Sequence, residues 1–557
     1  MFKILLFCQP YLFAYKWMLI TYILLKIIIN LLSLAPPYII GNFIDQLLYN
    51  NNVKFIFQYF MLFSVISFST LILGFITGLL YVNLQNQIGF NLNIEYIKKM
   101  QKSPLSFTQN QDTVYLNQRI NNDSNKLIIF CINIIQNILT NFALIAIPLL
   151  IMFNFHSLLS FVLLFVSFSY FLFYLLFRKF LYKITLNFRE SQSHFFAKLN
   201  EQLFNIRFIK LHSLFENFSK RLSKNFNNLM LNSLRYQKAN YVFSGLDQVV
   251  TMVAQMVLLL IGGIEIINGR LSIGQFIIIS TLFNKMIGAV RYFFGLGQNV
   301  QDNLVSYNRL QELNKIAYEP NGTQIVNEIH TIELKNISFS YGNEVVFQYD
   351  NIFFERGKIY GILGENGTGK STMLDIIVGL QIGNYNGLVL YNGISMDKID
   401  MYKLRENHIG VSEQEPTLIA DTVAFNVSPL NENALALYNN KLDDLVDILG
   451  LNNYLNTLPN NINTDISENS ANISGGEKQK LSILRTLVKN PDVVILDEPT
   501  SALDIGSKDK LRKYLVKISK NKIIIIVTHD HEFLDINNDI IIKLTSKKHQ
   551  DNRVSKN

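Results

Sequence analysis

Charged residues and cysteines are scarce in this chain of 557 residues. Asp, Glu, Lys and Arg make up only 17% of it, and Cys8 and Cys131 are the two cysteines. Two cysteines in apolar surroundings provide neither a disulfide framework nor a metal cluster, so we expect both to serve in packing. The low charge and a mean hydropathy of +0.20 exclude a disordered chain and argue against an ordinary soluble enzyme. A secretory signal peptide is not expected, because the first residues lack its apolar core and small-residue cleavage site.

Long apolar runs are confined to about the first 300 residues. A bilayer core of about 30 Å needs about 20 apolar residues in a helix. Six stretches reach that length: 17–40, 57–82, 127–153, 158–177, 242–267 and 276–296. They predict an all-α transmembrane domain of six helices within residues 1–318. Pro36 and Pro37 are expected to kink or end the first of these helices.

Basic residues gather in the two long polar segments that separate these stretches. Twelve Lys and Arg but only three acidic residues lie between Arg178 and Lys238. The earlier segment carries Lys98, Lys99, Lys102 and Arg119. Membrane proteins show this excess in cytoplasmic segments, so we expect a multi-pass protein of the cytoplasmic membrane with both termini in the cytoplasm. The helical periodicity of both segments predicts extensions of the membrane helices. The net charge of +8 does not indicate nucleic acid, which needs a basic face on a soluble domain.

A second domain, of α/β type, is predicted over residues 319–557. The apolar runs stop after Asn314, and Glu319-Pro320-Asn321-Gly322 has the composition of a turn-rich linker. Short strand-like segments at 331–334, 359–363, 493–496 and 523–527 then alternate with helical stretches. Such alternation favours a mostly parallel sheet with helices, and places this domain in the cytoplasm beside the basic segments.

The strongest motif is a glycine-rich loop between the apolar strand 359–363 and a helical stretch. Its residues fit G-x-x-x-x-G-K-[ST]: Gly364, Glu365, Asn366, Gly367, Thr368, Gly369, Lys370 and Ser371, with Thr372 next. The glycines let backbone N–H groups close around phosphate oxygens, and the helix N-terminus adds a positive dipole. We expect Lys370 to neutralise the β- and γ-phosphates of ATP and the Ser371 hydroxyl to bind Mg²⁺.

A second apolar strand, 493–496, ends in two carboxylates, Asp497 and Glu498. In a parallel sheet this strand delivers both to the carboxyl edge, where a nucleotide lies. We expect Asp497 to hold Mg²⁺ and Glu498 to act as general base toward the attacking water. The C-terminal domain is therefore predicted to be a P-loop NTPase that hydrolyses ATP.

The segment Ile473-Ser474-Gly475-Gly476-Glu477 resembles the signature motif of ATP-binding cassette (ABC) proteins. Further motifs resemble that family in the same order along the chain. They are Tyr341 for stacking on adenine, Gln414 for sensing Mg²⁺ and water, the interface loop Ser501-Ala502-Leu503-Asp504, and the γ-phosphate switch His529. The resemblance implies that Ser474, Gly475 and Gly476 contact ATP phosphate. The motif departs from the family pattern at Glu477, usually Gln, and at Ile473, usually Leu.

The membrane half also resembles this family, through looser motifs. Residues 119–123 and 205–210 are similar to the two cytoplasmic-loop motifs of exporters, and 268–274 to the outer turn before the sixth helix. The segment around Glu468 resembles the cross-talk loop that exporters have just before the signature motif. The resemblance implies a type I exporter fold, in which one chain is half of a transporter. The expected partner is a second copy of this chain, with a related half-transporter as the alternative. Two ATP molecules would lie at their interface and drive alternating access.

No residue identifies the cargo. Lys26, Lys285 and Arg291 lie within predicted spans, where charges usually face a cavity or a partner, although those near an end can snorkel to the surface. A cavity lined by these cations would accept an anionic lipid or an acidic peptide. We expect an amphipathic cargo and rank peptides first, lipids second and drug-like compounds third, by their frequency in the family. An ATP-gated regulator and an importer are less favoured functions, because the catalytic residues and the helix extensions fit an exporter better.

Overall fold

The computed structural model describes residues 1–49, 53–109, 116–341, 344–365, 367–429, 439–467, 473–535 and 538–544. By contacts the chain divides into two compact units, Met1–Lys99 with Asp112–Ile316, and Met100–Gln111 with Ala317–Asn557. The segment from Met100 groups with the second unit because Glu319 N donates to the Lys102 carbonyl over 2.8 Å. The domain boundary expected at residue 318 stays a prediction.

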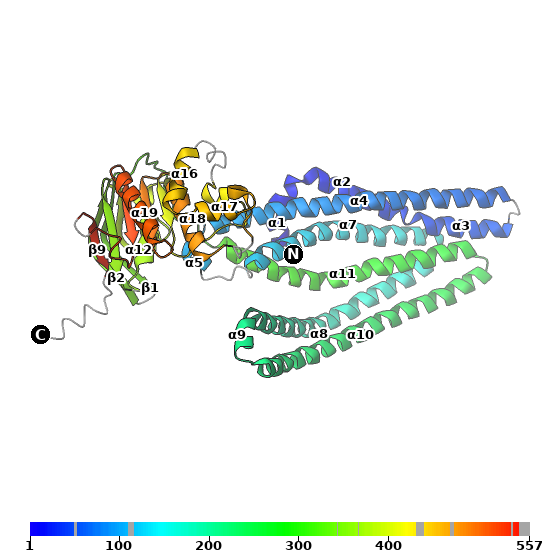
Figure 1. Cartoon of the computed structure of the whole chain (residues 1–557). Helices are drawn as coiled ribbons and strands as arrows, with labels where there is room; N and C mark the ends of the chain where they lie inside the picture. Colours follow the sequence, from blue (N-terminus) through cyan, green and yellow to red (C-terminus); the bar gives the residue numbers. More distant parts are fainter. Residues whose placement is uncertain are drawn as a thin grey trace. The chain divides into compact units, whose positions relative to one another are not determined.

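The first unit consists of long helices that run side by side (Figure 1). They are α1 (Phe2–Ala14), α2 (Lys16–Leu32), α3 (Ala35–Tyr49), α4 (Val53–Gln101), α7 (Ser124–Phe155), α8 (Ser157–Phe204), α9 (Ile206–Leu211), α10 (Phe215–Ile267) and α11 (Ile273–Asn314), with a π-helical stretch, η1 (Gln118–Asp123). At 1.5 Å per residue, α4 and α10 are about 75 Å long, far more than the ~30 Å of a bilayer core. The predicted helical extensions are therefore confirmed.

Five helical stretches among the described residues are long and apolar enough to cross a membrane. They are Lys16–Leu48, Val53–Gln101, Arg119–Phe155, Phe215–Ile267 and Ile273–Phe293. The remaining predicted span, 158–177, falls in α8, where many side chains lie outside the described residues. Helix α1 was not predicted, and the first span reaches Leu48 rather than residue 40.

The first span is broken between α2 and α3, at Ser33 and Leu34, as its two prolines predict. In a continuous helix the Ser33 carbonyl would accept a hydrogen bond from residue 37, but Pro37 has no N–H. The Lys285 ammonium of α11 donates to this carbonyl instead. An intramembrane cation thus satisfies a backbone group that lipid could not.

We predict that Lys285→Ala destabilises the protein by about 1 kcal/mol, because the Ser33 carbonyl is left without a donor. The loss should shrink in a Pro37→Ala background, since alanine at this position restores the N–H of a continuous helix. A double-mutant cycle, followed by denaturation in mixed micelles, measures the coupling. Strictly additive effects would contradict the assigned contact.

Helices α3 and α11 meet through two glycines at the outer end predicted for the sixth span. A Cβ built on Gly274 would lie 2.0 Å from the Gly41 carbonyl oxygen, so neither position accepts a larger residue without a shift of backbone. Asp45 accepts hydrogen bonds from the Ser272 hydroxyl and from Gly274 N, the latter over 2.7 Å. This carboxylate therefore caps the N-terminus of α11 and holds α3 against it.

The second unit contains two sheets. One is antiparallel, in the order β2-β1-β4-β5, formed by β1 (Thr331–Tyr341), β2 (Glu344–Glu355), β4 (Asn386–Tyr391) and β5 (Ile394–Ser395). The other is parallel, in the order β6-β7-β8-β3-β9, formed by β3 (Ile359–Gly364), β6 (Ile409–Ser412), β7 (Val493–Asp497), β8 (Ile523–Val527) and β9 (Ile540–Leu544). The expectation of one mostly parallel sheet was wrong for 331–334, which belongs to the antiparallel sheet.

Helices cover both faces of the parallel sheet. They include α12 (Lys370–Ile377), α13 (Met401–Asn407), α14 (Val423–Val427), α16 (Asn439–Ile448), α17 (Asn452–Thr457), α18 (Gly475–Val488) and α19 (Ile505–Ser519), while α5 (Leu105–Gln109) precedes them in the chain. Ile525 packs in one buried cluster with Ile376 of α12, and Ile524 in another with Leu484 of α18. This two-sided burial explains why β7 and β8 are continuous aliphatic runs.

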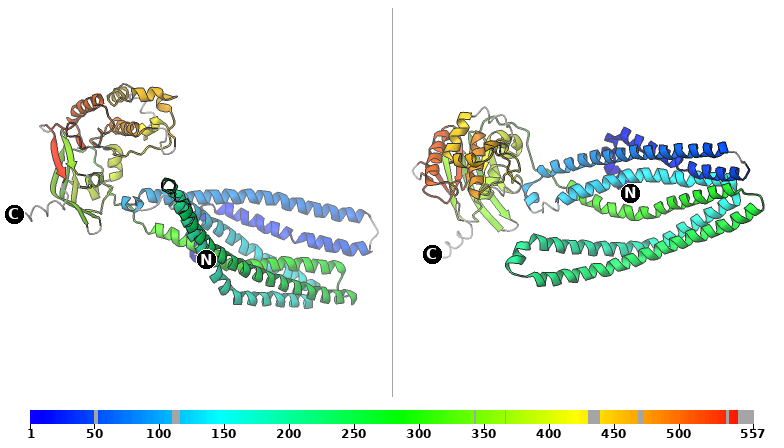
Figure 2. Two further views of the ribbon diagram at one scale, coloured as in Figure 1. Left: turned by 60° about the horizontal axis from the view of Figure 1, so that its bottom comes forward. Right: turned by 45° about the vertical axis from the view of Figure 1, so that its right-hand side comes forward.

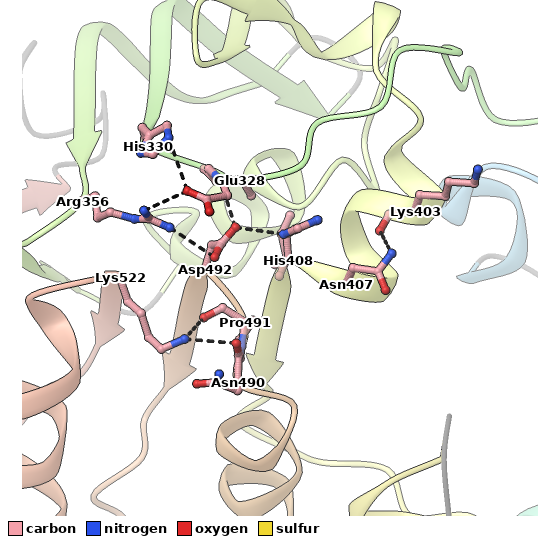
Figure 3. Close-up of polar contacts among 12 residues, drawn as sticks. Glu328, His330, Arg356, Lys403, Asn407, His408, Asn490, Pro491, Asp492 and Lys522 are labelled. Carbon is pink, nitrogen blue, oxygen red and sulfur yellow. Dashed lines mark hydrogen bonds and ion pairs between the residues drawn. The ribbon is translucent and has the colours of Figure 1, made fainter. Parts of the chain in front are cut away.

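An ion network joins the two sheets at the edge opposite the carboxyl ends of the parallel strands (Figure 3). Asp492, just before β7, accepts hydrogen bonds from Ile329 N at 3.0 Å and Arg356 at 3.3 Å, and lies 2.9 Å from His408 Nδ1. Arg356 also pairs with Glu328 at 3.2 Å. One carboxylate therefore ties the entry of β1 and the β2–β3 turn to the start of β7.

Asp492→Ala should lower the free energy of unfolding of the full chain by about 2–3 kcal/mol, because it leaves Arg356 and a backbone N–H short of an acceptor. The same change at exposed Asp509 should cost no more than about 0.5 kcal/mol. Thermal unfolding of both variants checks the difference, and equal stabilities would contradict the role of the network.

Candidate functional site

A cavity of about 360 Å³ lies at the carboxyl edge of the parallel sheet. Loops after β3, β6, β7 and β8 and one residue of β2 form it. Its lining comprises Val346, Gly367, Gly369, Lys370, Ser371, Thr372, Gln414, Asp497, Glu498 and His529. All of these except Val346 are site residues predicted from the sequence. Motifs spread over more than 160 positions thus meet at one place, as the parallel topology predicts.

The glycine-rich loop connects the end of β3 to the start of α12. Gly367 and Gly369 have φ of +81° and +87°, which side chains disfavour. A Cβ on Gly369 would also lie 2.6 Å from Phe347 Cδ1. The Thr368 hydroxyl closes the turn by donating to the Glu365 carbonyl over 2.9 Å. The N–H groups at the start of α12 therefore remain at the cavity, where they can bind an anion.

Lys370 crosses the mouth of this loop. Its ammonium donates to the Gly364 carbonyl over 2.7 Å and to the Glu365 carbonyl over 3.3 Å. It also lies 3.1 Å from His529 Nε2. Because an ammonium group has no acceptor, this contact needs Nε2 without a proton. The cation is thus held at the cavity by acceptors that phosphate oxygens can replace.

Asp497 and Ser371 form the part of the site suited to a divalent cation. The Ser371 hydroxyl lies 3.5 Å from Asp497 Oδ2, and Gln414 lines the same cavity. Burial, followed by repulsion from Glu498, raises the pKa of Asp497 to about 6. A hard cation among these oxygen atoms would offset both effects, so the residues present fit Mg²⁺.

Glu498 is held in a strained backbone conformation with φ of +50°. Its N–H donates to the Val527 carbonyl over 2.8 Å, and one carboxylate oxygen, Oε2, accepts from His529 N at 3.4 Å. The other oxygen, Oε1, is buried and accepts no hydrogen bond from any residue that the structure describes. The His529 ring lies nearby, with Nε2 3.7 Å from this oxygen. This oxygen is therefore available to accept a proton from water.

Gln479 positions Glu498 and was not predicted as a site residue. Its side-chain amide, buried on α18, donates to the Glu498 carbonyl over 2.5 Å and accepts from the Ser501 hydroxyl over 2.6 Å. A glutamine among buried aliphatic positions of α18 is the only signal that the sequence offers. The contact joins the signature helix to the backbone of Glu498, the residue that follows β7.

We predict that Gln479→Ala lowers kcat for ATP hydrolysis about 10- to 100-fold, because the Glu498 backbone loses its anchor. KM for ATP should stay within about twofold, since no phosphate-binding group is touched. Steady-state kinetics measure both, with exposed Gln324→Ala as the matched control. A parallel change in KM and kcat, or none in either, would argue against a positioning role.

The signature motif does not contribute to the cavity of its own chain, as far as the described residues show. Ser474 is the N-cap of α18 and forms a capping box with Glu477. The Glu477 carboxylate accepts from Ser474 N over 2.9 Å and from its hydroxyl over 2.7 Å. The carboxylate that replaces the family's usual Gln thus stabilises the helix start. Gly475 and Gly476 follow at its first turn, with Ser474 and Gly475 exposed.

The remaining predicted site residues belong to the first unit or have side chains outside the described residues. Tyr341 ends β1, and its side chain, like Asn366 and Glu468, is among those that the structure does not describe. Lys26 is on α2, 5.9 Å from the Tyr22 ring. Arg291 is exposed on α11, the helix that also carries Lys285.

Two known families match most of the chain between them. Residues 19–290 match the ABC transporter transmembrane region, and residues 348–501 match the ABC transporter family, its ATP-binding part. The chain belongs to the ABC transporters. This family consists of membrane transporters that hydrolyse ATP, so the predicted fold class, enzyme class and membrane location are confirmed at that level.

Similar proteins include bacterial exporters. The alpha-hemolysin translocation ATP-binding protein HlyB of Escherichia coli O157:H7 is 31% identical over 51% of this chain and 40% of its own length. A putative export ATP-binding/permease protein of Rickettsia typhi is 29% identical over 61% of this chain and 59% of its own. The structure of a bacterial Atm1-family ABC exporter with ATP bound has a TM-score of 0.77 over 97% of each chain at 16% identity, which shows a shared fold. The chain thus matches about two fifths to three fifths of the length of HlyB and the Rickettsia protein.

Proposed function

We propose that this ABC transporter couples ATP hydrolysis to export of an amphipathic molecule across the cytoplasmic membrane by alternating access. The observation that carries the proposal is the cavity at the carboxyl edge of the parallel sheet. It brings Lys370, Ser371, Asp497, Glu498 and His529 together in a chain that also has membrane-spanning helices. The basic segments of the first unit support an orientation with the nucleotide-binding unit and both termini in the cytoplasm.

Each of these residues has a definite task in hydrolysis. The loop N–H groups and Lys370 bind the β- and γ-phosphates. Ser371, Asp497 and Gln414 would hold Mg²⁺, which would neutralise charge on the phosphates. Glu498 Oε1 accepts a proton from the water that attacks the γ-phosphorus, while His529 orients the carboxylate. Water supplies the new P–O bond, and ADP leaves with the electrons of the bond that breaks.

The position of the signature motif supports a pair of chains. Ser474 is exposed at a helix N-terminus and lies outside its own chain's cavity. A second chain, facing the first, would bring Ser474 and Gly476 to the phosphates of each ATP. Because one chain carries every motif, two identical chains would form two complete sites, so we favour a homodimer over a pair with a related half-transporter. ATP would stabilise the closed pair by binding it more tightly than the open one.

Peptides are the cargo that we rank first. Two of the relatives are named for translocation of alpha-hemolysin and of toxin RTX-I, which supports a polypeptide cargo here. We propose Lys26, Lys285 and Arg291 as contacts for an acidic cargo, with lipid as the alternative. If they bind it, Lys26→Ala should reduce cargo-stimulated hydrolysis without changing basal hydrolysis. Unchanged stimulation in each of the three alanine variants would contradict this cargo site.

The decisive experiment follows Mg²⁺-ATP hydrolysis by the purified chain in lipid nanodiscs. We expect Glu498→Gln to abolish hydrolysis but not ATP binding, because only the proton acceptor is lost. Titration with peptides, lipids and lipophilic cations should show stimulation by one class. Activity that persists in Glu498→Gln would contradict the catalytic assignment.

A wild-type chain that does not hydrolyse ATP would contradict either the homodimer or the ability of the signature motif to support hydrolysis. Glu477→Gln distinguishes these, because it keeps the helix cap but removes the negative charge near the phosphate. If Glu477→Gln restores hydrolysis, Glu477 is the cause of the inactivity. If hydrolysis is still absent, a missing partner chain is favoured.

A further inference from the structure

A second cavity lies between α8 and α10, which pack side by side as an antiparallel pair in both views of Figure 2. Its volume is about 430 Å³, and the wall formed by the described residues is apolar. Six of the residues that line it are Phe180 and Ile184 of α8 and Ala239, Val242, Phe243 and Leu246 of α10. The cavity is contained in the first unit and is separate from the ATP site.

The cavity lies beside Ala239, a small residue of α10. One turn before it, Tyr236 stacks on Phe188 with centroids 4.9 Å apart and an interplanar angle of 7°. A further turn away, Asn232 donates to Ser191 Oγ over 2.6 Å. These contacts fix the spacing of the helices, and the methyl group of Ala239 is too small to fill it.

The distance along the helices places the cavity at one membrane surface. Val242 lies 25 residues before the end of α10 at Ile267, and Phe180 lies 23 residues after the start of α8 at Ser157. At 1.5 Å per residue these are about 38 and 35 Å. A bilayer has a core of ~30 Å and a total thickness of ~40–45 Å. In the proposed orientation, the cavity therefore lies at the boundary between acyl chains and headgroups of the inner leaflet.

Two cations complete the cavity on its cytoplasmic side. Arg235 and Lys238 also line it, and since the wall is apolar they contribute their methylene stems. Both are exposed, and neither has a hydrogen bond or ion pair with a residue that the structure describes. They are three positions apart on one helix, where like charges repel. A bound anion would remove this repulsion.

We propose that the α8–α10 cavity binds an anionic phospholipid of the inner leaflet, with an acyl chain in the cavity and its phosphate between Arg235 and Lys238. A peptide segment fits less well, because the apolar wall offers no partner for its backbone N–H and carbonyl groups. The lipid is a bound component of the transporter rather than its cargo. The proposal rests on the proposed orientation but not on ATP hydrolysis.

The test reconstitutes the full chain in nanodiscs of equal phosphatidylglycerol and phosphatidylcholine, and measures lipids retained after detergent extraction by native mass spectrometry. The wild type should retain phosphatidylglycerol preferentially. Arg235→Ala with Lys238→Ala should weaken this retention about 30-fold, from about 1 kcal/mol per basic residue near an anionic headgroup. Ala239→Phe should abolish retention by filling the cavity.

Exposed Lys224→Ala is the matched control, because it removes one positive charge from α10 about 20 Å from Lys238 and should leave retention unchanged. Glu498→Gln should also retain lipid like the wild type, which separates failure of this proposal from failure of the proposed function. Gel filtration shows that each variant is folded.

Equal retention of both lipids would overturn the proposal, as would a double variant that keeps its preference for phosphatidylglycerol. A wild type without retained lipid, together with loss of the dimer in Ala239→Phe, would assign the cavity to contact with a second chain and also overturn it.

Discussion

The site depends on two adjacent carboxylates that the fold places at the end of a buried strand. Asp497 and Glu498 repel each other, and burial makes their charge costlier, as the raised pKa of Asp497 shows. The surrounding groups offset part of this cost: the Lys370 ammonium counteracts the rise in the pKa of Asp497, and the Glu498 backbone is fixed by Val527 and Gln479. This arrangement prepares the site for a triphosphate with its divalent cation, which would complete the charge balance.

The strained backbone of Glu498 links the site to the signature helix. Glu498 has a positive φ that its neighbours must enforce, and Gln479 of α18 supplies part of that restraint. Ser474 begins the same helix, fourteen residues long and packed on the parallel sheet. In the proposed pair of chains, a phosphate bound at the start of α18 would act on the helix that positions Glu498. Hydrolysis would then respond to closure of the pair.

Motifs defined by residue types at fixed spacing could be predicted from the sequence. Contacts that depend on how helices and strands pack could not. The loop from Gly364 to Ser371 and the carboxylates after β7 follow from residue types at fixed spacing, and parallel topology explains why they meet. Gln479 resembles any polar residue on a partly buried helix until the structure shows its partners. The pairing of Lys285 with the Ser33 carbonyl depends on how α11 packs against a broken helix. The cavity at Ala239 could not be predicted from the sequence either, because it depends on the spacing between α8 and α10, which other residues set.

In the proposed pair of chains, each ATP site takes its signature motif from the second chain. Lys370→Ala removes the phosphate-binding cation, and Gly476→Asp places a negative charge at the start of α18. An added Cβ on Gly476 meets Ala502 at an ordinary 3.5 Å, so the second change is compatible with the fold. The direct measurement is ATP hydrolysis by each variant alone and by the two chains expressed together. Each variant alone should be inactive, and the mixture should regain a substantial fraction of wild-type activity, because mixed pairs contain one intact site. A mixture as inactive as its components, or an active Gly476→Asp chain, would contradict this arrangement.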